Sequence, residues 1–112
     1  MRIHITEASS VGLTPSLRAY IEEKIGGLSK FVRRFDLAGV AEVYLEVSRT
    51  TRHHHKGNVF RAEADLRLPG KILRAFHEAM DLRIAIDILR SKLRAEIEKY
   101  RTRYTRRSRC VR

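Results

Sequence analysis

Two long stretches of alternating apolar and polar residues, joined by a polar segment, most constrain how this 112-residue chain folds. Valine and leucine recur mostly at every second position in residues 40–51, and apolar residues take every second position in residues 59–68. A period of two is typical of strands that bury one face. The connecting residues 52–58 are rich in hydrogen-bond donors, so the pattern predicts an antiparallel hairpin.

Two shorter segments predict further strands. Residues 2–6 alternate, with Ile3 and Ile5 on one face. Pro69-Gly70 is typical of a type II turn, in which glycine supplies a positive φ. Residues 71–78 then form a strand that returns on the previous one, and we expect Ile72 and Phe76 at its alternating apolar positions.

Two stretches have the spacing of amphipathic helices. Thr14 followed by Pro15 is a favourable start for a helix that reaches about Arg34, with an interruption at Gly26-Gly27. Asp81 is suited to cap a last helix, whose apolar stripe continues for more than twenty residues to about residue 104. Tyr100 and Tyr104 lie on this apolar stripe, so we expect them to pack in the core.

The predicted fold is therefore α+β, with the order β-α-β-β-β-α and two helices packed on one face of a four-stranded sheet. The other face of the sheet stays partly open to water. The length fits a single domain. We predict a folded α+β domain over residues 1–104 and a basic, flexible tail over residues 105–112.

Positive charge is concentrated at the C-terminal end. The net charge is +11 and the sequence pI about 10.7, and residues 81–112 contain eleven Lys or Arg against four Asp or Glu. Such a surface favours a polyanion, because each phosphate it neutralises releases condensed counterions. No apolar run is long enough to span a bilayer and no signal-peptide pattern is present, so we expect a cytoplasmic protein that binds no membrane.

Neither a metal site nor catalysis is expected. Three consecutive histidines, His53 to His55, alternate sides on an extended chain and cannot all face one ion. The sequence has no glycine-rich phosphate loop and no zinc spacing. The loop is therefore interpreted as an RNA-contacting or simply solvated segment, and a nuclease that uses these histidines with Glu46 is the enzymatic alternative. Tyr44, on the polar face of its strand, is a candidate for stacking on bases.

Several segments together resemble one known family. They are Leu17, Lys24, Leu28, Phe31 and Phe35 of the first helix, His55-Lys56-Gly57 with Phe60-Arg61-Ala62-Glu63, Leu68-Pro69-Gly70, and Asp81-Leu82, Ala85-Ile86-Asp87, Lys92-Leu93, Ile97 and Lys99-Tyr100. Their order and spacing over residues 1–104 resemble the ribosome hibernation-promoting factors, also called ribosome-associated inhibitor or sigma-54 modulation proteins. The chain is similar in length to the short form of that family, but Arg83 stands where an aromatic residue is usual.

The resemblance implies a fold like that of double-stranded-RNA-binding domains and a role in the bacterial stress response. Such a factor occupies the decoding region of the small ribosomal subunit and blocks tRNA and mRNA without chemistry. The implied partners are small-subunit ribosomal RNA and the 70S ribosome. No cofactor, metal or small-molecule substrate is implied, and we expect a monomer away from the ribosome.

The predicted RNA-binding residues combine the resemblance with the charge pattern. On the last helix, Lys92, Lys99, Arg101 and Arg103 match cations of the family, and Arg83, Arg90 and Arg94 add charge beside the apolar stripe. Elsewhere the predicted contacts are Lys24, Arg52, His55 and Lys56. The simpler alternative is a solvated helix face with local ion pairs, such as Arg94 with Glu98.

Three other functions fit the same composition. A constitutive structural RNA-binding protein would also be basic, and a regulator of transcription would use the charge on duplex DNA or on polymerase. A nuclease would cut the RNA that it binds. We therefore predict a ribosome hibernation factor, with these three as alternatives.

Overall fold

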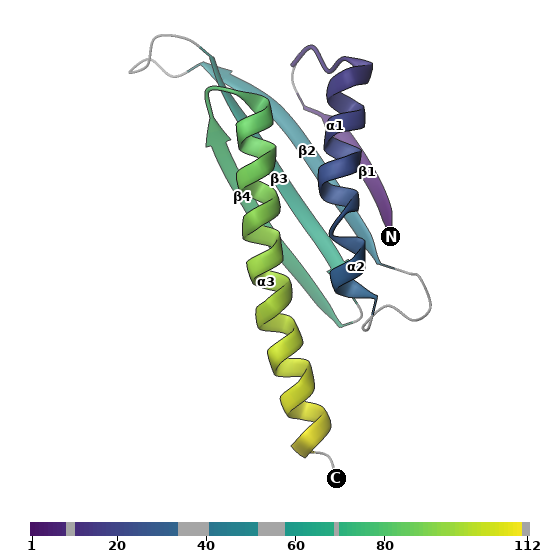
Figure 1. The fold of residues 1–112 in the computed structure, drawn as a ribbon. Coiled ribbons are helices and arrows are strands. Elements are labelled where there is room, and N and C mark those ends of the chain that lie inside the picture. Colours follow the sequence, from purple (N-terminus) through teal and green to yellow (C-terminus); the bar gives the residue numbers. More distant parts are fainter. Residues whose placement is uncertain (9–10, 34–40, 52–57, 69, 111–112) are drawn as a thin grey trace.

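The computed structural model describes residues 1–8, 11–33, 41–51, 58–68 and 70–110 (Figure 1). The strands are β1 (Arg2–Glu7), β2 (Glu42–Thr51), β3 (Asn58–Leu68) and β4 (Lys71–Ala79). The helices are α1 (Pro15–Gly26), α2 (Ser29–Val32) and α3 (Leu82–Cys110). This confirms the predicted order, with the first helix divided in two.

The four strands form one mixed sheet in the order β1-β2-β3-β4. β1 runs parallel to β2, whereas the pairs β2–β3 and β3–β4 are antiparallel. A parallel pair needs a crossover connection, which α1 and α2 supply. The predicted hairpin is confirmed, with β2 and β3 paired from Glu42 opposite Arg67 to Thr51 opposite Asn58.

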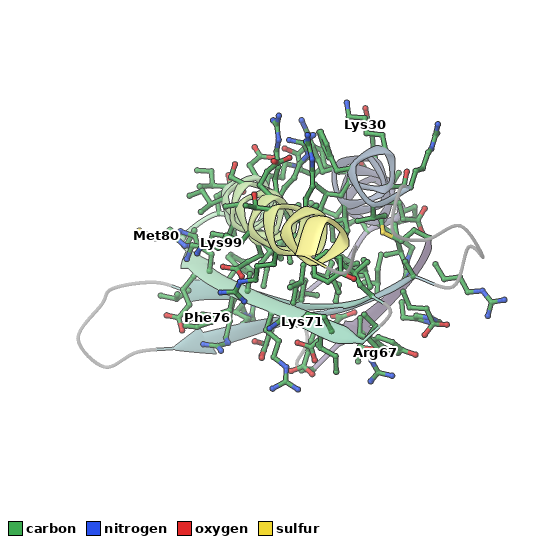
Figure 2. All side chains as sticks on the ribbon, turned by 90° about the horizontal axis from the view of Figure 1, so that it is seen from below. Lys30, Arg67, Lys71, Phe76, Met80 and Lys99 are labelled. Atoms are coloured by element: carbon green, nitrogen blue, oxygen red, sulfur yellow. The ribbon has the colours of Figure 1, made fainter. Side chains whose placement is uncertain are left out.

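All three helices cover the same face of the sheet, and the opposite face is open (Figures 1 and 2). The core lies between these layers. From α3 it receives six side chains that are at most 6% exposed, namely Leu82, Ala85, Ile86, Leu89, Leu93 and Ile97. Their spacing keeps one stripe of the helix against the sheet, as the sequence predicted.

Local capping contacts fix where the helices begin. The Thr14 side chain accepts a hydrogen bond from the Leu17 backbone N–H at 3.1 Å, and Pro15 occupies the start of α1. The Asp81 carboxylate accepts one from the Arg83 backbone N–H at 2.8 Å. Both contacts satisfy backbone N–H groups that have no partner inside the helix, so both predicted starts are confirmed.

The prediction that Ile72 and Phe76 form the apolar, buried face of β4 is wrong. Ile72 and Phe76 are 46% and 51% exposed on the open side, whereas Leu73 is only 4% exposed. The register with β3 places Leu73 opposite the buried Leu66, which turns the neighbouring residues outward. The turn before β4 contains Gly70 with a φ of 73°, so the predicted positive φ is confirmed.

The last helix is longer than predicted. The backbone of α3 stays helical to Cys110, beyond the expected end near residue 104. The division into a domain (1–104) and a basic tail (105–112) stays a prediction. Among the described residues, no helix is both long and apolar enough to cross a bilayer.

Candidate nucleic-acid interface

The cations of α3 divide between two opposite flanks of the helix. A helical residue turns by about 100° relative to its predecessor, so positions seven or eleven apart share a side. The flank facing α1, here the α1 flank, carries Arg83, Arg90, Arg94 and Arg101. The other, the β4 flank, carries Lys92, Lys99 and Arg103. The predicted cations of α3 therefore do not form a single surface.

On the α1 flank, cations of two helices lie close to the ring of Tyr20. The Arg83 guanidinium carbon lies 5.1 Å from the ring centre, and the Lys24 Nζ lies 5.6 Å from it. The Tyr20 hydroxyl donates a hydrogen bond of 2.6 Å to the Asp87 carboxylate. Arg83 thus contacts a ring from α1, at the position where the family resemblance led us to expect an aromatic residue.

A second ring repeats this arrangement further along the helix pair. The Lys30 Nζ lies 5.1 Å from the ring centre of Phe31, and the Arg94 guanidinium carbon lies 4.7 Å from it. Exposed cation–π contacts contribute about 0.5–1 kcal/mol each. Arg94 therefore contacts Phe31, whereas Glu98 lies 3.6 Å from Arg101.

Arg90 joins the two helices directly. Its Nε donates a hydrogen bond of 3.1 Å to the backbone carbonyl oxygen of Lys24, in the last turn of α1. Carbonyls of the last turn have no partner inside the helix, and a cation there also interacts favourably with the helix dipole. Arg90 is half-buried, so part of its guanidinium serves the packing of α1 against α3.

The β4 flank is occupied by contacts within the protein. The Lys92 ammonium donates a hydrogen bond of 2.9 Å to the Phe76 carbonyl oxygen, on the outer edge of the sheet. The Lys99 ammonium lies 3.4 Å from the Glu96 carboxylate. A lysine at a sheet edge also opposes pairing with another strand. Arg103 is exposed.

On the open face of the sheet, arginines lie beside acidic residues. Arg61 lies 3.2 Å from Glu78, and Arg74 lies 3.5 Å from Asp65. Figure 2 shows Arg67 on this face and Lys30 on the helix side. Because acids accompany the arginines, this face suits a polyanion less well than the α1 flank does.

The ring of Tyr44 on the open face of the sheet is contacted by residues of both neighbouring strands. The ring of His4, in β1, stacks on the Tyr44 ring with 4.5 Å between the ring centres. The guanidinium carbon of Arg67, in β3, lies 4.2 Å from the centre of the Tyr44 ring. Its hydroxyl donates a hydrogen bond of 2.7 Å to Glu42. Stacking of Tyr44 on bases stays a prediction, whereas Tyr100 packs against the core as predicted.

The hydrogen bond to Asp87 raises the pKa of Tyr20, with smaller contributions from desolvation and from the charge of Asp87. A raised pKa preserves the protonated phenol, so the bond persists below the ordinary tyrosine pKa and is lost as pH rises through the folded-state value. We expect Asp87→Ala to lower the pKa of Tyr20 in a titration of phenolate absorbance. Glu42→Ala serves as the control, because it should lower the pKa of Tyr44 instead. An Asp87→Ala titration curve that matches the native one would contradict the assignment.

Three predicted residues, Arg52, His55 and Lys56, lie outside the described residues. Within the described part of the chain, no group of three or more His, Cys, Asp or Glu is placed to hold a metal ion. The eleven RNA contacts stay predictions. The sequence reasoning missed the contacts that the rings of Tyr20 and Phe31 make with cations of two helices. The one available signal was Tyr20 four residues before Lys24, a spacing that places both on the same side of a helix.

Comparison with known proteins finds one matching family and several similar relatives. Residues 4–105 match the family described as "Sigma 54 modulation protein / S30EA ribosomal protein". The chain is 34% identical over 104 residues to the ribosome hibernation promotion factor of Deinococcus radiodurans, which covers 93% of this chain and 51% of that protein. It is also 33% identical over 102 residues to the ribosome hibernation promotion factor of Lactococcus lactis, and this match covers 89% of this chain and 50% of that protein. The chain thus spans about half the length of these curated relatives.

Two solved structures share the fold. A ribosomal subunit interface protein from Coxiella burnetii has a TM-score of 0.69 and 22% identity, covering 91% of this chain and 99% of that one. The N-terminal domain of Protein Y from Thermus thermophilus has a TM-score of 0.63 and 25% identity, covering 89% and 99%. The first of these likenesses concerns the fold alone.

Proposed function

Since this chain belongs to the sigma-54 modulation protein / S30EA ribosomal protein family, we propose that it is a ribosome hibernation factor. In this proposal it binds small-subunit ribosomal RNA in the decoding region and blocks tRNA and mRNA. The relatives named as ribosome hibernation promotion factors support the activity. The action is binding, with no chemical step and no cofactor.

The observation that carries the proposal is the cationic strip between the helices. It consists of Lys24, Lys30, Arg83, Arg90 and Arg94, which all contact the two rings or the α1 backbone. Cations fixed in this way present an ordered charge to phosphate oxygens. Contacts to phosphates fix the position of a protein on RNA without reading its sequence.

The remaining predicted contacts take a secondary place in this proposal. Arg101 extends the strip toward the end of α3, and Arg52, His55 and Lys56, which follow β2 in the sequence, add further contacts. The β4 flank, with Lys92, Lys99 and Arg103, makes a separate contact, because it points away from the strip. The whole body then occludes the path of tRNA and mRNA.

Sedimentation of the chain with purified ribosomes through a sucrose gradient, combined with a translation assay, tests the proposal. We expect the chain to travel with small subunits and 70S ribosomes in low salt, to be released as salt rises, and to inhibit translation. A chain that stays at the top of the low-salt gradient would overturn the proposal in favour of a regulator of transcription. Binding without inhibition would identify a structural RNA-binding protein, and shortened RNA would identify a nuclease.

A further inference from the structure

The α1 flank contains the same three-part arrangement twice. In each case an aromatic ring of α1 or α2 is contacted by a lysine of its own helix and by an arginine of α3. The parts are Tyr20 with Lys24 and Arg83, and Phe31 with Lys30 and Arg94. We propose that these are two separate phosphodiester-binding sites, in which Tyr20 and Phe31 are positioning residues for the cations. This inference rests on the proposed binding of ribosomal RNA.

Each site brings two positive charges from different helices toward one ring. Each cation lies less than 6 Å from the centre of its ring, and an anion that contacts both cations is attracted by each of them. A phosphodiester is such an anion, and its two free oxygens can accept hydrogen bonds from a guanidinium and an ammonium at the same time. The pairing of one arginine with one lysine at each ring therefore fits a phosphate of the proposed RNA partner.

The rings reduce the conformational entropy that the cation side chains lose when they bind a phosphate. Fixing a free arginine or lysine side chain costs up to about 2 kcal/mol of rotamer entropy. Tyr20 and Phe31 are half-buried and pack against the core, so their positions are set by the fold. A cation that already lies over such a ring loses less freedom when it contacts a phosphate.

The two sites are too far apart to bind one phosphate. Arg83 and Arg94 are separated by eleven residues, which corresponds to about 16 Å along the helix. Even in duplex DNA, consecutive phosphates of one strand advance by only about 3.4 Å along the helix axis. The sites therefore contact phosphates several nucleotides apart or on different strands, which fixes the direction of α3 on the RNA.

The two sites differ in one respect. The Tyr20 hydroxyl is held by Asp87, whereas Phe31 has no hydroxyl. Asp87 fixes the ring but places a negative charge beside the first site. We expect Asp87→Asn, which keeps an oxygen acceptor and removes the charge, to bind small subunits several-fold more tightly than the native chain.

Double-mutant cycles on the full chain test the inference, with purified small ribosomal subunits as the probe and affinity measured over a series of salt concentrations. We expect Arg83→Ala to lower the salt slope by about 0.7–0.9, since one phosphate contact is lost. Tyr20→Leu should weaken affinity several-fold while the slope stays the same, because the charges remain but are no longer positioned. For the second site, we expect Arg94→Ala to lower the salt slope in the same way and Phe31→Leu to weaken affinity at an unchanged slope.

Coupling between the variants distinguishes two separate phosphate sites from a diffuse positive charge on the helices. Within each site, the double variant should weaken binding less than the product of the two single effects. Between Arg83→Ala and Arg94→Ala the effects should multiply, because distant sites act independently. Arg18→Ala is the matched control, since it removes one exposed positive charge from α1 and should leave the slope unchanged.

Melting temperatures of all variants distinguish positioning from loss of fold, and Tyr20→Phe keeps the ring if Tyr20→Leu does not fold. Multiplying effects within a site, or an unchanged slope for both arginine variants, would overturn the inference. In that case salt-dependent binding of the native chain would still support the proposed function. A native chain that does not bind small subunits would overturn both.

Discussion

Replacing Arg83, Arg94 and Arg101 together with alanine is expected to weaken binding to small ribosomal subunits by about 100-fold at physiological salt. The slope of log affinity against log salt should fall by about 2–3, because three phosphate contacts at about 0.7–0.9 each are removed. These arginines share the α1 flank, where the rings of Tyr20 and Phe31 hold two of them. Equilibrium binding to purified subunits at several salt concentrations measures both quantities.

The β4 flank supplies a control with the same loss of charge from the same helix. Replacing Lys92, Lys99 and Arg103 with alanine should reduce affinity and slope clearly less. Two of its three cations give up existing contacts to reach RNA, since Lys92 donates to the Phe76 carbonyl and Lys99 lies beside Glu96. In the first triple, Arg101 gives up its ion pair with Glu98. An equal or larger loss from this triple would show that the β4 flank is the main interface.

Neither triple should unfold the chain, because the six side chains are exposed. Circular dichroism and thermal unfolding of both variants check this point. The comparison then depends on the placement of the charges, since the net charge changes equally in both.

The elements that could be predicted from the sequence are those whose signals are local. The hairpin follows from a period of two in both strands, and the stripe of α3 follows from three- and four-residue steps. Thr14 and Asp81 cap helices through contacts with residues two or three positions away. Such contacts need no knowledge of the rest of the fold.

The errors arose where a distant partner decides the outcome. In β4, Ile72, Leu73 and Phe76 are all apolar, so periodicity alone left the buried face ambiguous and the register with β3 settled it. The Tyr20 hydroxyl bonds to Asp87 across 67 positions of sequence. Helical spacing separates the two flanks of α3, but no local pattern indicates that α1 lies beside one of them, and so the sequence could not show which flank faces α1.

Packing of α3 onto the sheet also determines where the arginines point. Leu89 is fully buried and directly precedes Arg90, which donates to the Lys24 carbonyl in α1. A helix that rotated about its axis would move both flanks together. The core stripe therefore sets the orientation of the cationic strip as well as the stability of the fold.

Leu89→Ala is accordingly expected to lower the free energy of unfolding by about 2–5 kcal/mol, because it removes buried surface and leaves a cavity. This is a large part of the roughly 5–15 kcal/mol that is usual for a single domain. Urea denaturation monitored by circular dichroism measures the change. Ile84→Ala, on the same helix but 51% exposed, should change it by only about 0.5 kcal/mol.

Binding assays on the same two variants connect the core with the interface. At a temperature where Leu89→Ala is still mostly folded, its salt slope should equal that of the native chain, since no phosphate contact is lost. Its affinity should fall only in proportion to the unfolded fraction, unless the cavity lets α3 rotate. Comparable destabilisation by Ile84→Ala would contradict the assignment of the stripe, because an exposed isoleucine would then be as important for packing as a buried leucine.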